Sequence, residues 1–270
     1  MSKEITFVNL FSDRPFKGDR VAVCPLEKSP LTSWMQTVAT ELNSPITAFC
    51  YQPAGATNRH LRCFTPQTLM PFCTHGALAA AHLFADARQK SVFHTENEEL
   101  EVQVENGWLA MELPARKTEP APAPPALHVG LGVVPIFVGK NNRDYLVALS
   151  SEEVLRALQP DFSLLRDLDA ERIVITARAE TTGYDYVCRA FAPHCSETEE
   201  CVSADAHALL APFWAQRRNT KSLVALHASK REGTVRVQML RDRIRLSLYA
   251  VITMQVRLCE QGLEELEGEQ

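Results

Sequence analysis

The amino-acid sequence predicts an α+β fold made of two similar units. A chain of 270 residues has the length expected of two domains of ordinary size. A break at 114–125, with five prolines in twelve residues, separates two halves that each contain short strand-like runs and one prominent helix. The halves also share a pattern, in which a strand, an F-x-P turn, a loop and a cysteine precede that helix.

Short strand-like runs fill the first half of the sequence. Residues 100–104 alternate apolar and polar side chains, as a strand with one buried face does. Residues 32–42 open with Thr and Ser, which cap helices, and 75–87 are rich in Ala and Leu with apolar residues three and four apart. We therefore predict helices at 32–42 and 75–87, and strands at 5–10, 21–24, 47–51, 60–64, 91–94, 100–104 and 108–113.

The second half repeats this organisation after the proline-rich break. We predict helices at 151–158 and 203–216, and strands at 133–138, 145–149, 172–176, 184–191, 223–227, 234–239 and 243–249. The break reads as a connector, which gives domains at 1–116 and 117–250. One more strand-like run, at about 251–262, is expected to return to the first domain.

Composition excludes several classes of protein. A net charge of −5 and a pI near 5.9 argue against a nucleic-acid-binding or anionic-membrane surface. No run approaches the roughly 20 apolar residues of a membrane span, and the start of the sequence lacks the apolar core of a secretory signal. We expect a cytoplasmic protein whose partner is a small-molecule substrate, with neither nucleic acid nor membrane involved.

The motifs of common cofactor and metal sites are missing. The eight cysteines contain no C-x-x-C pair, and Cys195 and Cys201 with His194 and His207 would make only a forced metal site. The sequence also has no G-x-G-x-x-G and no G-x-x-x-x-G-K-[ST] phosphate loop. We therefore expect no nucleotide cofactor, no other cofactor and no metal site.

The repeated pattern places one cysteine before each prominent helix, Cys73 in the first half and Cys201 in the second. A thiol at a helix N-terminus faces free backbone N–H groups and the positive end of the helix dipole, which favour the thiolate. If two such units face one cleft, a ligand would lie between two acid/base groups. The alternative is that both cysteines are small buried apolar residues.

Three further ionisable residues lie beside these cysteines. His75 follows Cys73 at the start of its helix, and Glu200 and Asp205 flank Cys201. Each could serve as an acid or base in a cleft, where environment shifts pKa values. Each could equally be a cap or a favourable partner of the helix dipole. His207, further along the second helix, is interpreted as structural.

Four stretches of the chain resemble the PhzF-like family, the phenazine-biosynthesis-type isomerases. The sequence DRPFKG at 13–18 matches D-R-P-F-x-G, and FTP at 64–66 with CTH at 73–75 is similar to F-T-P…C-G-H. The stretches ECVSADAH at 200–207 and HASKREG at 227–233 resemble D-P-V-T-G-S-A-H and Q-x-S-x-R-G-G. The resemblance implies the diaminopimelate epimerase fold, with two domains that are each a β-barrel-like sheet around a central helix. It also implies an active site in the interdomain cleft and a homodimer.

The departures from the family pattern concern the acid/base groups. Ile46 stands where the family's N-x-S-E-T motif has its glutamate, and an isoleucine cannot transfer a proton. His75 is retained, whereas Glu200 and Asp205 replace the family's Asp and Ser. Cysteine-dependent epimerases and racemases of the same fold have C-G-[NH]-G and C-G-[ST]-G motifs, which the segments at Cys73 and Cys201 resemble.

These observations favour an isomerase that moves a double bond by shifting a proton. We expect its substrate to be a small, unsaturated, carboxylated or amino-acid-like metabolite of specialised or antibiotic biosynthesis. A two-cysteine racemase or epimerase, an inactive binding protein on the same fold and an enzyme of another class such as a C–C hydrolase remain alternatives. The expected catalytic residues are Cys73, Cys201, His75, Asp205 and Glu200. The expected substrate-binding residues are Asn43, Ser44, Ile46, Thr74, Gly76, Ala77, Val202, Ser203 and Ala204.

Overall fold

A computed structural model describes residues 3–53, 55–56, 58–84, 90–195, 199–200 and 202–259. The chain divides into two compact units: unit 1 comprises Met1–Met111 and Leu248–Gln270, and unit 2 comprises Glu112–Ser247. No helix in the described part of the chain is both long and apolar enough to span a membrane.

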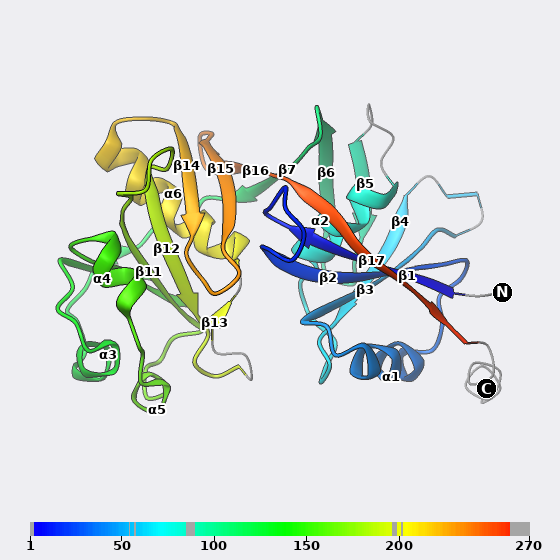
Figure 1. Ribbon diagram of the computed structural model, residues 1–270, viewed down its shortest axis with the longest axis horizontal. Helices are drawn as coiled ribbons and strands as arrows, with labels where there is room; N and C mark the ends of the chain where they lie inside the picture. The colour runs from blue at the N-terminus through cyan, green and yellow to red at the C-terminus, as the bar shows by residue number, and fades with distance from the viewer. Residues whose placement is uncertain are drawn as a thin grey trace. The chain divides into compact units, whose positions relative to one another are not determined.

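Unit 1 is a mixed sheet with two helices (Figure 1). Strands β2 and β3 pair in parallel, as do β4 and β5. The remaining neighbours are antiparallel: β17 with β1, β1 with β2, β3 with β4, β5 with β6 and β6 with β7. Its elements are β1 (Lys3–Leu10), β2 (Asp19–Leu26), α1 (Thr32–Leu42), β3 (Ile46–Tyr51), β4 (Arg59–Phe64), α2 (Thr74–Phe84), β5 (Lys90–His94), β6 (Glu99–Glu105), β7 (Trp108–Pro114) and β17 (Ala250–Leu258).

Unit 2 repeats this pairing. Its parallel pairs are β10 with β11 and β12 with β14, and β9, β15 and β16 extend the sheet in antiparallel fashion. The elements are β8 (Glu119–Pro120), α3 (Pro125–Leu131), β9 (Phe137–Lys140), β10 (Asp144–Ala148), α4 (Glu152–Ala157), α5 (Phe162–Leu165), β11 (Arg172–Arg178), β12 (Tyr186–Phe191), β13 (Glu199–Glu200), α6 (Ala204–Arg218), β14 (Ser222–His227), β15 (Gly233–Met239) and β16 (Arg243–Leu248). The prediction of two similar α+β units is confirmed.

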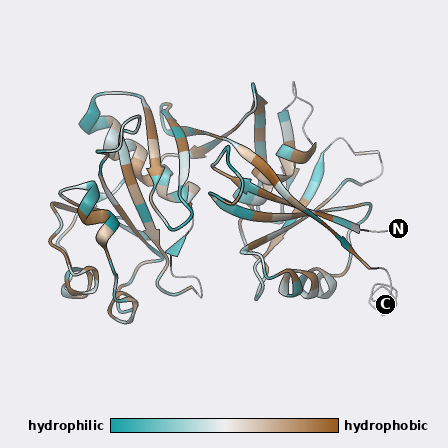
Figure 2. Cartoon of the chain, viewed as in Figure 1, coloured by the Kyte–Doolittle hydropathy of each residue, from teal (hydrophilic) through white to brown (hydrophobic). Residues whose placement is uncertain are grey.

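The helix with the most buried residues in each unit packs against strands, α2 against β1 to β6 and α6 against β14 and β15. Helix α2 buries six consecutive residues from Gly76 to Ala81, and α6 buries nine residues between Ala204 and Trp214. A helix that is apolar on every side has to be covered on every side. The strands around it alternate buried and exposed positions, as in β15, and both hydrophilic and hydrophobic segments occur on the strands of each unit (Figure 2).

The proline-rich segment differs from the expected connector. Strand β8 within it pairs with β9, and α3 begins at Pro125, so the segment contributes structure to unit 2. Proline suits both places, because β8 pairs on one side only and the first helical position needs no N–H donor. The following strand, expected at 133–138, is found at Phe137–Lys140.

The chain returns to unit 1 through β17. This strand pairs with β1 over its whole length, from Lys3 opposite Leu258 to Leu10 opposite Ala250, with one irregularity between Phe7 and Val8. Figure 1 shows the last strand running beside the first. Strand β1 is therefore flanked by β2 from the start of the chain and by β17 from its other end.

A buried carboxylate in unit 2 gives a test of acid stability. Burial alone would raise the pKa of Glu152. Its carboxylate, however, accepts hydrogen bonds from the hydroxyl and N–H of Thr181, the guanidinium of Arg156 and the N–H of Glu180. These bonds lower the pKa from 4.5 to about 2. A depressed pKa stabilises the fold above the unfolded-state value, and this contribution is lost as the pH falls from about 4.5 to about 2.

We expect Glu152→Gln to lower the unfolding free energy at pH 7 by about 3 kcal/mol, an upper value from the size of the pKa difference. The loss should shrink when the pH is taken to 3, because the carboxyl is by then protonated in the unfolded chain, which removes part of the difference between the two states. Urea unfolding at the two pH values measures both effects. The neighbouring Glu153, which is exposed, supplies the control Glu153→Gln. Equal losses for the two variants would contradict the prediction.

Candidate active site

The loop between β1 and β2 places a carboxylate at the start of β2. Asp19 pairs with Leu10 in the antiparallel ladder and is 5% exposed. Just before it, Gly18 has a φ of +65°, and a Cβ at this position would lie 1.8 Å from the carbonyl oxygen of Leu10. Asn9 holds the loop from the other side by accepting the N–H of Phe16 at 3.0 Å. The motif at 13–18 thus folds into a tight loop that ends directly before Asp19, at the start of β2.

Asp19 meets His75, the second residue of α2. The His75 Nδ1 and Asp19 Oδ2 atoms are 2.7 Å apart, and the side chains are only 14% and 8% exposed. The edge of the Phe11 ring packs on the imidazole with centroids 5.3 Å apart. A carboxylate that accepts from Nδ1–H fixes the tautomer and orientation of the ring, which leaves Nε2 as the nitrogen that exchanges protons. Such a pair can act as an acid/base group in which the carboxylate orients the imidazole.

Ile46 belongs to the same end of unit 1. It begins β3 and pairs in parallel with Val21, whose side chain shares a face with that of Asp19 two residues earlier. Helix α2 packs against both β2 and β3. A carboxylate is thus present one strand away from the position where the family resemblance expects a glutamate.

The segment before β3 and the start of that strand contribute buried polar groups. Asn43 ends α1 with a φ of +45°, and its carbonyl oxygen accepts from Arg20 at 3.1 Å. Ser44 and Thr47 are both 0% exposed, and within the described part of the chain their hydroxyl oxygens make no hydrogen bond. A buried hydroxyl without a hydrogen-bond partner destabilises the folded state. Ser44 and Thr47 are therefore candidates for hydrogen bonds to a bound molecule.

Cys73 lies directly before α2, as predicted. Its carbonyl oxygen accepts the N–H of Ala77 at 2.8 Å, and the residue is 4% exposed. Its thiol is hydrogen-bonded to that of Cys63, and burial together with this contact raises the pKa of Cys63 well above its usual range. Gly76 permits this close approach, since a Cβ there would lie 2.2 Å from the Cys63 sulfur. Cys73 thus sits in a buried thiol pair, and its part in catalysis stays a prediction.

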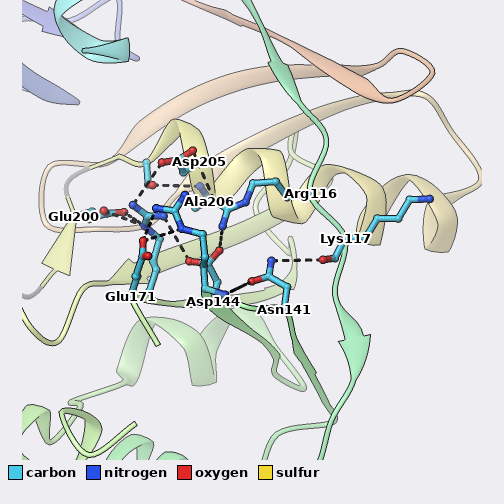
Figure 3. A network of polar contacts seen from close by, with 11 residues as sticks. Arg116, Lys117, Asn141, Asp144, Glu171, Glu200, Asp205 and Ala206 are labelled. Carbon is cyan, nitrogen blue, oxygen red and sulfur yellow. Dashed lines mark hydrogen bonds and ion pairs between the residues drawn. The ribbon is translucent and has the colours of Figure 1, made fainter. Parts of the chain in front are cut away.

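In unit 2 the structure brings Glu200 and Asp205 to the same arginine. The Nε atom of Arg172 donates to both carboxylate oxygens of Glu200 at 3.1 Å, and its Nη2 lies 3.6 Å from Asp205. Arg116 adds a second ion pair to Asp205 at 3.7 Å. Figure 3 shows these side chains converging on one network. Both predicted acids are therefore engaged in ion pairs.

At the centre of this network lies Asp144, which is 1% exposed. Its carboxylate is hydrogen-bonded to Arg116 and is 3.6 Å from Nη1 of Arg172. Burial raises the pKa of Asp144, and the two arginines oppose that shift. Asp144 is thus a buried charge that depends on its arginine partners.

The remaining predicted residues of unit 2 are mostly buried. Ser203 caps α6, since its hydroxyl accepts the N–H of Ala206 at 3.2 Å. Val202 and Ala204 are 2% and 4% exposed. Cys201 lies outside the described residues. In unit 1, Thr74 begins α2 next to His75.

We expect Arg172→Gln to destabilise unit 2 by about 3 to 5 kcal/mol, because it removes a partner of the buried Asp144 carboxylate. Urea unfolding followed by circular dichroism measures the change. The control is Arg143→Gln, which breaks an ion pair with Glu171 whose side chains are 46% and 57% exposed and should cost about 0 to 1 kcal/mol. A loss of similar size in both variants would contradict the expectation.

Sequence reasoning missed four residues of these two clusters. Asp19 immediately follows the motif at 13–18, and that position was a usable signal. Arg116, Asp144 and Arg172 come from a proline-rich segment and two strand starts, and no spacing in the sequence links them. Only the pairing of β10 with β11, which sets Asp144 beside Arg172, brings them together.

Comparisons with known proteins agree with the architecture. The family model described as "Phenazine biosynthesis-like protein" matches residues 8–255. An uncharacterized isomerase of Halalkalibacterium halodurans is 34% identical, over 96% of this chain and 99% of its own length. A PhzF family protein of Enterococcus faecalis has a crystal structure with a TM-score of 0.91 and 28% identity, over 96% of this chain and 100% of that one.

The fold also extends beyond these relatives. A hydroxyproline epimerase of Agrobacterium vitis shares it with a TM-score of 0.58 at 8% identity, over 98% of this chain and 95% of that one. The predicted epimerase-type α+β fold is therefore confirmed, and so is the predicted relationship. With a family match that runs through both units and a relative named as an isomerase, the chain belongs to the phenazine biosynthesis-like family and is an isomerase.

Proposed function

We propose that the protein moves a double bond in a small unsaturated carboxylic or amino acid by a proton shift, with His75 as the proton carrier and Asp19 as its positioning residue. The observation that carries this proposal is the 2.7 Å contact between Nδ1 of His75 and the Asp19 carboxylate. It gives the chain an oriented acid/base group although Ile46 occupies the family's glutamate position.

The reaction needs only proton movement. Nε2 of His75 takes a proton from a carbon next to the unsaturated system, and the electron pair of the broken C–H bond spreads into that system. The imidazolium exchanges this proton with solvent and then delivers a proton to a second carbon, so that one double bond has moved and His75 is neutral again. With one carrier, both transfers occur on the same face of the substrate. The start of α2, where backbone N–H groups point outward, favours a carboxylate beside His75.

A two-cysteine epimerase receives less support from the described residues. Cys73 is 4% exposed and hydrogen-bonded to Cys63, and Glu200 and Asp205 are held by arginines. The matching family model is described as "Phenazine biosynthesis-like protein". This description supports a ring-containing, unsaturated substrate of specialised metabolism.

Deuterium incorporation tests this proposal. The protein is incubated in deuterated water with a panel of small β,γ-unsaturated carboxylic and amino acids, cyclic dienes among them, and the compounds are followed by proton NMR. We expect at least one to show a moved double bond, with deuterium only at the carbon that gains the proton. Deuterium exchange at a single carbon without double-bond movement would instead indicate epimerisation. Binding of a panel compound without any exchange would indicate a binding protein.

A further inference from the structure

Three side chains of unit 2 form a buried cluster that takes no part in the site described above. Cys188 lies on β12, His227 ends β14, and these strands pair in parallel with the two residues opposite one another. His207, in the first turn of α6, joins them from the helix that packs on β14. All three residues are 0% exposed. Among the residues that the structure describes, these form one group of three possible metal ligands whose ligand atoms lie within 4.8 Å of one another.

We propose that Cys188, His207 and His227 bind one zinc-class metal ion, through the Cys188 sulfur and one imidazole nitrogen of each histidine. The Cys188 Sγ and His227 Nδ1 atoms are 3.5 Å apart. Zinc bonds of about 2.3 Å to sulfur and about 2.0 Å to nitrogen, at a tetrahedral angle, set the two ligand atoms about 3.6 Å apart. This edge of the site thus already has the spacing of a metal-bound pair. The ligand atom of His207 lies within 4.8 Å of those of Cys188 and His227.

The surroundings of His207 resemble those of a metal ligand. Tyr186 lies two residues before Cys188 on the same strand face, and its hydroxyl is 3.0 Å from Nδ1 of His207. When Nδ1–H donates to that hydroxyl oxygen, Nε2 carries the lone pair for the metal. Tyr186 in turn stacks on Trp214, whose indole N–H donates to Thr176 at 2.9 Å. The orientation of the imidazole is therefore fixed through a packed chain of contacts.

The donor set selects the class of ion. One thiolate and two imidazoles suit zinc and cobalt, whereas magnesium and calcium prefer oxygen ligands. Binding replaces the thiol proton: the Cys188 S–H bond breaks, the sulfur–metal bond forms, and one proton leaves to solvent. Because the ligands are fully buried, the ion enters while unit 2 folds and stabilises that unit.

The expectation of no metal site, made from the sequence, concerned ligands that are close together along the chain. These three come from two strands and a helix, and only the parallel pairing of β12 with β14 places Cys188 beside His227.

The test uses the full chain with Zn²⁺ or Co²⁺ as the only added metal. The protein is produced in zinc- or cobalt-supplemented medium, and is also refolded from denaturant with a small excess of Co²⁺. We expect one metal ion per chain, and for cobalt a thiolate-to-metal charge-transfer band with the visible absorption of a low-coordinate site. Cys188→Ser should lose that band, and the control Cys24→Ser, at another fully buried cysteine, should keep it.

X-ray absorption on the zinc-loaded wild-type chain decides the question even where a variant fails to fold. The expected spectrum has one sulfur and at least two nitrogen neighbours around zinc. The proposal is overturned if the refolded wild-type chain retains no metal, if zinc has no sulfur neighbour, or if Cys188→Ser keeps the charge-transfer band. In the first case the cluster is a thiol–imidazole hydrogen bond in the core. None of these readouts depends on the proposed isomerase reaction.

Discussion

His75→Gln is expected to lower kcat by about 10² to 10⁴, the range found when a general acid or base is removed. Glutamine retains a polar side chain that can bond Asp19, so the start of α2 should keep its structure. It cannot, however, take a proton at the Nε2 position. The measurement is kcat for the substrate identified by deuterium incorporation, with circular dichroism to verify folding.

The matched control is His82→Gln, in the last turn of the same helix. This histidine is partly buried, and burial lowers its pKa, but it lies two turns from Asp19. Its substitution should leave kcat within about twofold. Near-wild-type turnover in His75→Gln would remove His75 from the mechanism and return attention to Cys73.

Asp19→Asn is expected to lower kcat on the order of 10²-fold or more while KM changes little. An amide can present N–H to Nδ1 and so favour the tautomer whose Nε2 carries the proton, the wrong state for a base. The readouts are kcat and KM across the pH range, and the pH profile of kcat should change in shape because the carboxylate no longer faces the imidazole. A merely structural aspartate would lower stability and leave the profile of the folded fraction unchanged.

The control for Asp19 lies in the same loop. Asp13 is exposed, and Asp13→Asn should leave both kcat and the pH profile as in the wild-type protein. Equal kcat values for the Asp19 and Asp13 variants would show that the contact with His75 has no catalytic role.

Periodicity predicted much of the fold. The helix expected at 32–42 has those bounds, and α6 differs from its predicted range by one or two residues at each end. These segments combine an amphipathic or apolar pattern with clear ends, which local sequence encodes well. The short helices α3 and α5 were missed, because seven and four residues are too few for a periodic pattern to show.

The candidate site was harder to predict, because its contacts join distant segments. The sequence pointed to His75, Glu200 and Asp205, but their partners Asp19 and Arg172 depend on strand pairing. Ionic partners can come from any element that the fold brings near, so no spacing rule identifies them. A motif ending one residue before Asp19 was the strongest local hint.

The return of β17 to unit 1 has a consequence for protein synthesis. The ribosome completes the sequence of unit 2 before it makes the strand that pairs with β1. The 147 residues from Glu112 to Leu258 take roughly 7 to 30 s at translation rates of about 5 to 20 residues per second. During that interval the nascent chain carries β1 with one edge lacking its partner, an edge open to pairing with other chains. The order of emergence therefore makes unit 2 the first part that can fold to completion, although it comes second in the sequence.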